Sequence, residues 1–136
     1  MRILLSIIFS FLTLLATPIS KDIDFINIYK DVKNTEKITL MIYTTKSCPQ
    51  CAYMKQKVFK DKFIKNILDE HFSILQKDVQ VDELPDGFKY FGIPTIFFID
   101  KDANKLGEFI GSCRAKEFSH KLKEIIKKAK NWENLF

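Results

Sequence analysis

Residues 38–51 read Ile-Thr-Leu-Met-Ile-Tyr-Thr-Thr-Lys-Ser-Cys-Pro-Gln-Cys, and they decide the fold. The first part, Ile38 to Tyr43, is an apolar run of β-forming residues that is too short for a helix, which predicts a buried strand. At Pro49 the pattern changes, because proline suits the first position of a helix and apolar residues then recur at about helical spacing. The stretch therefore predicts a strand that leads directly to a helix carrying two cysteines, Cys48 and Cys51.

The position of these cysteines predicts redox chemistry. Unpaired backbone N–H groups and the positive end of the dipole favour an anion at a helix N-terminus, so the pKa of Cys48 should fall below the ordinary value of about 8.5. Lys46 adds a nearby positive charge. Cys51 lies one helical turn further on, where its thiol can attack a mixed disulfide formed at Cys48. We therefore expect Cys48 to be the nucleophile and Cys51 the resolving thiol.

Two other roles for the cysteine pair, a zinc site and a structural disulfide, have less support in the sequence. A zinc site usually has a second cysteine pair or a pair of histidines, but here only Cys113, His71 and His120 remain, and they are scattered. A purely structural disulfide between Cys48 and Cys51 would close a very small loop and constrain little. We expect no metal and no cofactor, and the sequence has no phosphate loop or nucleotide fingerprint.

Beyond the cysteines, the pattern predicts an α/β domain with a mixed sheet flanked by helices. The helix from Pro49 should bend near Lys60, and apolar runs and turn residues mark the later elements. These are a strand at Phe72–Val79, a loop at 82–87, a short helical turn at Phe88–Phe91, a hairpin of Thr95–Ile99 with Leu106–Ile110, and an amphipathic helix at Ala115–Lys130. Before the first strand, Asp22–Val32 is expected to be a short helix or an extended leader. Phe63, Phe72, Phe97, Phe98 and Phe118 fall on expected core faces.

The first twenty residues differ from the rest of the chain. Arg2 precedes an apolar run from Ile3 to Ala16 and a small polar end, which is the plan of a secretory signal peptide. We expect residues 1–20 to be removed on export, in bacteria to the periplasm, and residues 21–136 to form one domain. The alternative is an uncleaved segment that holds the domain at the membrane, because no good cleavage site is present.

The chain of 136 residues carries a formal net charge of +5. Its lysines are spread among acidic neighbours, as in Lys60-Asp61-Lys62, which indicates a solvated surface and no nucleic-acid partner. An anionic membrane or an acidic partner protein remains an alternative reading of this charge. A monomer is the default expectation.

A second motif, Gly92-Ile93-Pro94-Thr95, precedes a strand and completes a resemblance to the thioredoxin-like superfamily. The resemblance covers Ile38 to Lys128, and the surrounding pattern is more similar to exported members than to cytosolic thioredoxin. It implies a cis proline at Pro94 that packs beside the cysteine pair. It also implies that the backbone of Ile93 pairs with a bound partner chain, and that Pro49 and Gln50 belong to the same substrate groove.

The sequence departs from the family pattern at three positions. Ser47 replaces the tryptophan that cytosolic thioredoxins have before the first cysteine, and Ile42 replaces their buried aspartate. Gln50 replaces the tyrosine or histidine of glutaredoxins and periplasmic oxidants. Because a neutral glutamine stabilises a thiolate less than a histidine does, we expect a weaker oxidant than those proteins.

Cys113 follows Gly111-Ser112 at the junction of the last strand and helix. In the thioredoxin-like superfamily, which this sequence resembles, the corresponding loop lies on the active-site face. The resemblance therefore makes Cys113 a candidate for a second resolving thiol or a glutathionylation site. The alternative, which we favour, is a small and partly buried packing residue.

These features predict an exported thiol:disulfide oxidoreductase that acts on protein thiols or disulfides, with the direction of a reductase. A reductase in an oxidising compartment needs an electron donor, for which a membrane disulfide reductase is a candidate. The alternatives are a thiol module that binds Cu(I) or Zn²⁺ in the manner of a metallochaperone, a disulfide oxidant or isomerase on the same fold, and a redox-inactive interaction domain.

Overall fold

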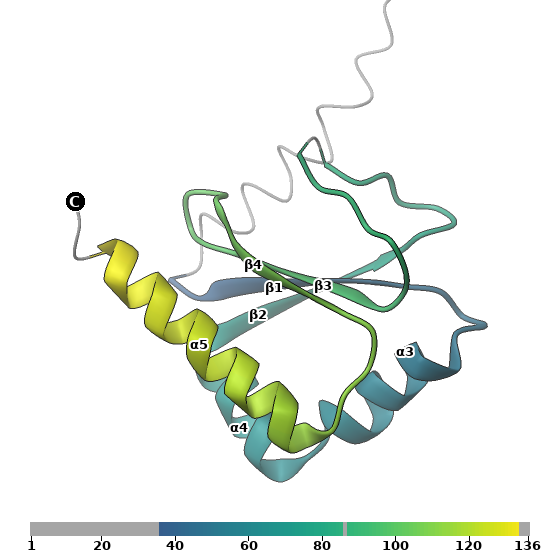
Figure 1. The fold of residues 1–136 in the computed structure, drawn as a ribbon, viewed down its shortest axis with the longest axis horizontal. Coiled ribbons are helices and arrows are strands. Elements are labelled where there is room, and N and C mark those ends of the chain that lie inside the picture. The colour runs from purple at the N-terminus through teal and green to yellow at the C-terminus, as the bar shows by residue number, and fades with distance from the viewer. Residues whose placement is uncertain (1–35, 86, 134–136) are drawn as a thin grey trace, which may run out of the picture.

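The computed structural model describes residues 36–85 and 87–133 (Figure 1). The expected signal peptide and the element expected at Asp22–Val32 lie outside this range. The described elements are, in order, β1 (Ile38–Thr44), α3 (Pro49–Tyr53), the π-helix η2 (Met54–Val58), α4 (Lys62–His71), β2 (Phe72–Asp78), β3 (Thr95–Ile99), β4 (Lys105–Ile110) and α5 (Ala115–Glu133). Every strand predicted in this range is present, with ends that differ by one residue at most.

The four strands form one mixed sheet in the order β2-β1-β3-β4. β1 pairs in parallel with β2 and antiparallel with β3, and β3 pairs antiparallel with β4. All residues of β1 and β3 are buried, as expected of central strands that are covered on both faces. The predicted mixed sheet with flanking helices is confirmed.

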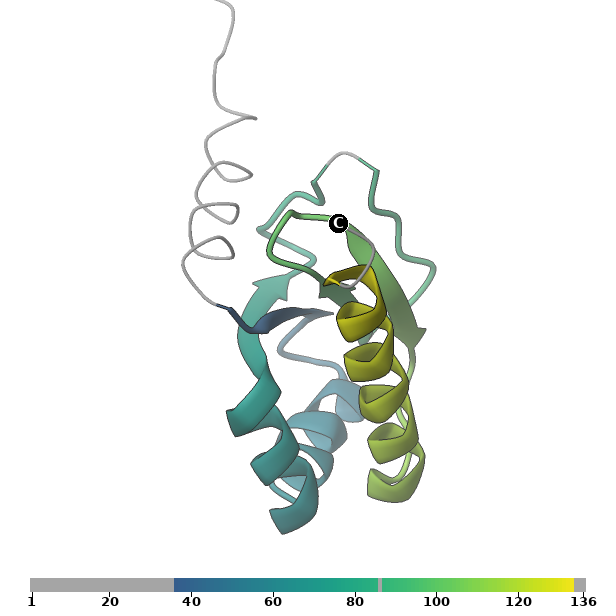
Figure 2. The same ribbon diagram turned by 90° about the vertical axis from the view of Figure 1, so that its left-hand side faces the viewer.

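The helices cover one face of the sheet. In Figures 1 and 2, α3, α4 and α5 all lie on the same side of the strands. Alternate residues of β1, such as Leu40 and Ile42, point to this side and meet Ile96 and Phe98 of β3 in the main core. The helices contribute the other buried members, chiefly Met54, Val58, Ile64, Leu68, Phe118, Leu122 and Ile125.

The opposite face is covered by the segment that joins β2 to β3. Met41, Tyr43, Phe97 and Ile99 form a second core there, and Leu84 and Phe88 pack on it. The Tyr43 hydroxyl donates a hydrogen bond to the Glu83 carbonyl oxygen at 3.0 Å. This bond fixes part of the segment to the sheet.

The helical turn predicted at Phe88–Phe91 is wrong, because these residues form neither a helix nor a strand. The Phe88 ring packs edge-on against Phe97, with centroids 5.1 Å apart, and the Tyr90 ring stacks on Tyr43 at 6.1 Å. These two ring contacts hold the segment against the sheet without a helical turn.

The bend predicted near Lys60 is confirmed. Phe59 N–H donates to the Met54 carbonyl oxygen at 2.8 Å, the five-residue spacing of a π-helix, and a turn then separates η2 from α4. Asp61 caps α4 by accepting hydrogen bonds from the N–H groups of Phe63 and Ile64. The core position predicted for Phe63 is wrong, since its side chain is 54% exposed and Ile64 takes the inner position.

None of the helices formed by the described residues combines the length and apolar character that a membrane span requires.

Candidate functional site

Cys48 is the N-cap residue of α3, immediately after the turn that follows β1. Its Sγ accepts a hydrogen bond from the Cys51 backbone N–H at 3.1 Å, and Pro49 occupies the first helical turn, where no N–H is needed. Cys48 and Cys51 form a disulfide with a Cα–Cα distance of 5.2 Å. The strand and the capped helix therefore hold the two sulfurs together.

The two cysteines differ in accessibility. Cys51 is 0% exposed and Cys48 is 7% exposed, while the neighbouring Pro49 and Gln50 are exposed. Of the two cysteines, Cys48 is therefore the one nearer to solvent, whereas the chain shields Cys51 completely.

The segment before β3 lies beside the disulfide. The Ile93–Pro94 peptide bond is cis, and the Ile93 carbonyl oxygen is 3.9 Å from Cys48 Sγ. The Thr95 hydroxyl donates to the Gly92 carbonyl oxygen at 2.6 Å, and Gly111 N–H donates to the Pro94 carbonyl oxygen at 2.8 Å. The structure thus brings together two motifs that are far apart in the sequence.

Gly111 has a φ of +88°, a conformation that side-chain-bearing residues adopt at a cost. This geometry turns the chain between β4 and α5 while its N–H meets Pro94. The glycine therefore links the start of the last helix to the segment beside the disulfide.

The surroundings of the disulfide contain little fixed charge. The first turn of α3 has no acidic residue, and Lys46 is exposed. Ile42, at the position where cytosolic thioredoxins have a buried aspartate, is 1% exposed in the main core. Across the described residues, the buried polar side chains are Thr39, Thr44, Thr95 and Ser119, so no buried carboxylate is available to exchange a proton with Cys51.

Cys113 is a free cysteine, partly buried against the main core. Burial, with a smaller contribution from the Glu117 carboxylate, raises the pKa of its thiol to about 11. Its thiol is therefore protonated, and unreactive as a nucleophile, at neutral pH.

Among the residues that the structure describes, the cysteine pair belongs to no cluster of potential metal ligands. Within the described parts of the chain, no three His, Cys, Asp or Glu side chains gather as metal ligands would. His71 lies beside Glu70 at the end of α4, and His120 is exposed on α5.

Sequence reasoning missed two apolar side chains near the site. Phe91 is 88% exposed just before the Gly92–Thr95 segment, and Ile110, paired with Thr95 across the sheet, is 46% exposed. Tyr90 stacks on Tyr43, so the residue next to Phe91 is anchored. The available signal was the aromatic pair Tyr90-Phe91 directly before the proline motif.

A disulfide at the start of a helix, with one slightly exposed cysteine and a cis proline beside it, is typical of a thiol:disulfide oxidoreductase site. Residues 27–126 match the thioredoxin-like domain family, and the chain belongs to that family. The fold and the redox-active pair predicted from the sequence are confirmed. The comparison with curated protein sequences found no match.

Solved structures of thioredoxin-like proteins share this fold. The C-terminal domain of Neisseria meningitidis DsbD in the oxidised form is 18% identical with a TM-score of 0.60, covering 76% of this chain and 93% of that domain. A thioredoxin from Thermus thermophilus is 22% identical with a TM-score of 0.58, over 68% of this chain and 76% of its own. The periplasmic thioredoxin SoxS from Paracoccus pantotrophus is 18% identical with a TM-score of 0.54, over 68% and 99%.

Proposed function

We propose that this protein is an exported thiol:disulfide reductase that keeps cysteines of other exported proteins reduced. The observation that carries the proposal is the asymmetric disulfide at the start of a helix beside Pro94, in which Cys48 keeps 7% exposure and Cys51 has none.

The exchange uses only the two cysteines and the partner. The Cys48 thiolate attacks one sulfur of the partner disulfide, forming a mixed disulfide and releasing the other partner sulfur as a thiolate. The Cys51 thiolate then attacks Cys48 Sγ, which breaks the mixed disulfide and frees the second partner thiolate. The partner gains two electrons, and this protein is left with the Cys48–Cys51 disulfide of the described structure. A dithiol donor, for which a membrane disulfide reductase is our candidate, must then reduce that disulfide.

The partner would bind along the segment that borders Cys48. The Ile93 backbone is close to the sulfur and Pro94 shapes the turn, so an extended partner chain can pair with this backbone while its cysteine faces Cys48. Pro49 and Gln50 form the exposed rim on the helix side. Phe91 and Ile110 add apolar surface at the other rim, which favours partners with an apolar residue near the reacting cysteine.

The proposed direction of exchange is supported by the side chains around the cysteine pair, which add little to the stabilisation of a thiolate that the helix N-terminus already gives. Strong disulfide oxidants stabilise their reduced form, and a charged or histidine neighbour of the thiolate does this. Here the neighbour is the neutral and exposed Gln50, and no charged side chain is buried among the residues that the structure describes. These observations support a reductase.

The proposal that the protein is exported is supported by its N-terminal sequence and by its structural similarity to one periplasmic protein. Residues 1–20 have the plan of a signal peptide, and SoxS, which shares the fold, is a periplasmic thioredoxin. An uncleaved segment that holds the domain at the membrane would serve the same chemistry.

The deciding experiment is the reduction potential of the Cys48/Cys51 pair, measured by equilibration with glutathione and dithiol buffers followed by trapping and mass spectrometry. We expect a value near that of thioredoxin, about −270 mV. A value near about −120 mV would identify a disulfide oxidant and overturn the proposed direction. The potential is measured in the Cys113→Ser variant, in both the glutathione and the dithiol buffers, because this variant lacks the third thiol.

A further inference from the structure

A groove of about 420 Å³ lies between α4 and α5, away from the disulfide. We call it the α4–α5 groove. Its lining residues are Phe63, Ile67 and His71 of α4 with Lys123, Ile126, Lys127, Lys130 and Asn131 of α5. In Figure 1 the C-terminal half of α5 lies at the opposite end of the picture from the start of α3, so the groove is separate from the redox site.

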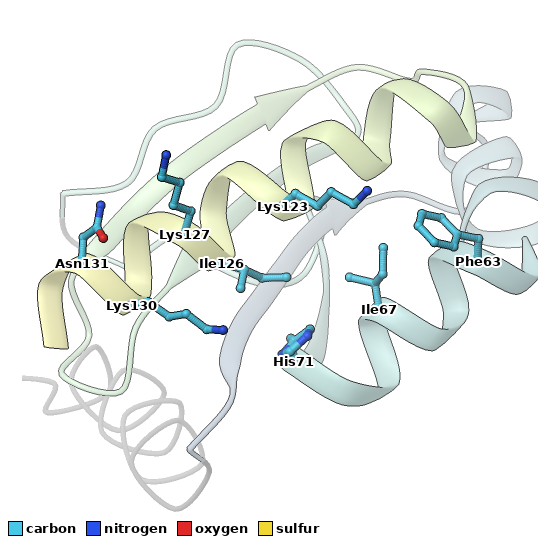
Figure 3. A pocket seen from close by; sticks show the side chains of 8 residues that line it. All are labelled: Phe63, Ile67, His71, Lys123, Ile126, Lys127, Lys130 and Asn131. Atoms are coloured by element: carbon cyan, nitrogen blue, oxygen red, sulfur yellow. The ribbon is translucent and has the colours of Figure 1, made fainter. Parts of the chain in front are cut away.

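The floor of the groove is apolar. Figure 3 shows Ile67 and Ile126 facing each other across the gap, and both pack partly against the main core. Phe63 forms one end with its side chain 54% exposed. A partner that covers these side chains removes apolar surface from water, which favours binding.

The two ends of the groove are cationic. Lys123 extends toward Phe63, with its Nζ 5.2 Å from the ring centre, and Lys130 points toward His71 at the other end (Figure 3). Lys127 also lines the groove, but its ammonium points away from α4 in Figure 3. Lys123 and Lys130 are seven residues apart on one helix, a separation of about 10 Å along its axis.

These lysines are not neutralised within the described part of the chain. Of the nearby carboxylates, Glu124 pairs with Lys121 and Glu70 lies beside His71. No described acidic side chain forms an ion pair with Lys123, Lys127 or Lys130. The groove therefore presents apolar surface between positive charges that have no described counter-charge.

We propose that the α4–α5 groove docks an acidic amphipathic helix of a partner protein. Two carboxylates seven residues apart on such a helix have the same spacing of about 10 Å as Lys123 and Lys130, and an apolar side chain between them would rest on Ile67 and Ile126. A fatty acid has a single carboxylate, which can neutralise only one end. The charge complementarity therefore favours the helix, which would hold a partner independently of the redox reaction.

The probe is a fluorescent peptide of about four helical turns, with glutamates seven residues apart and leucine between them. Its binding to the full chain is measured by anisotropy at rising ionic strength. We expect salt-sensitive binding that weakens by about tenfold or more in Lys123→Glu/Lys130→Glu, because two attractive pairs become repulsive. The control Lys89→Glu/Lys101→Glu makes the same change in net charge outside the groove and should bind like the wild type.

A charge-swapped peptide separates a lost site from a lost fold. With lysines in place of the glutamates, the peptide should prefer Lys123→Glu/Lys130→Glu to the wild type, which requires a folded groove. Equal binding of the acidic peptide to all three proteins, or no binding, would overturn the proposal. The proposal would also be overturned if laurate or anionic lipid vesicles bound in a manner that depends on Lys123 and Lys130 and the peptide did not bind in that manner.

Discussion

At the scale of single residues, the three thiols have different environments and therefore different reactivities. Cys48 caps a helix and is 7% exposed, Cys51 is fully shielded, and burial raises the pKa of Cys113 to about 11. Below that pKa the Cys113 thiol holds its proton: at pH 8 about one molecule in a thousand is a thiolate, against about a quarter for an ordinary exposed cysteine.

We predict that iodoacetamide modifies reduced Cys48 first, and Cys113 at least about a hundredfold more slowly than an exposed thiol at pH 8. The Cys113 rate should rise about tenfold per pH unit and level off near pH 11, as the thiol loses its proton. Peptide mass spectrometry after timed quenching gives each rate. Rapid modification of Cys113 at pH 7, or loss of turnover in Cys113→Ser, would instead assign it a part in the exchange.

At the scale of elements, α4 depends on its cap. Asp61 Oδ1 accepts hydrogen bonds from Phe63 N–H at 3.0 Å and Ile64 N–H at 3.2 Å, two groups that have no partner within the helix. We predict that Asp61→Ala lowers the free energy of unfolding by about 1 kcal/mol.

Asp61→Asn is the matched control for this change, because it keeps an oxygen at the cap and removes the charge. It should retain most of the stability, since asparagine and aspartate cap about equally well. Urea denaturation of the three proteins measures the effect. Equal losses in both variants would show that charge, rather than the cap hydrogen bonds, stabilises this end of α4.

The elements show what sequence patterns can and cannot predict. The strands were predictable because short apolar runs of β-forming residues, such as Thr95–Ile99, favour a buried strand over a helix. The cysteine pair could be placed because the sequence around it predicts the start of a helix, and Pro94 could be placed beside it through the resemblance to the thioredoxin-like superfamily. The segment around Phe88 and Tyr90 was not predictable, because its path depends on rings of Tyr43 and Phe97 that lie far away in the chain. The exposure of Phe63 likewise depends on where α5 packs.

At the scale of the whole molecule, redox state and folding stability are linked by a thermodynamic cycle. If the pair is more reducing in the folded protein than in the unfolded chain, the oxidised form must be the more stable one against unfolding. A difference of about 30 mV between the two potentials corresponds to about 1.4 kcal/mol. The disulfide closes a very short loop, so its effect on the entropy of the unfolded chain is small.

We predict that the oxidised protein unfolds at higher urea concentration than the reduced protein, because neither Gln50 nor any described buried charge stabilises the reduced thiolate. Paired denaturation curves of Cys113→Ser, with and without a dithiol reductant, measure the difference without interference from the third thiol. The reduction potential of the cysteine pair, measured also in the urea-unfolded chain, completes the thermodynamic cycle. The difference between the two potentials must then agree with the measured difference in stability. A more stable reduced form would place the protein with the disulfide oxidants, because only stabilisation of the dithiol state by the fold gives that order.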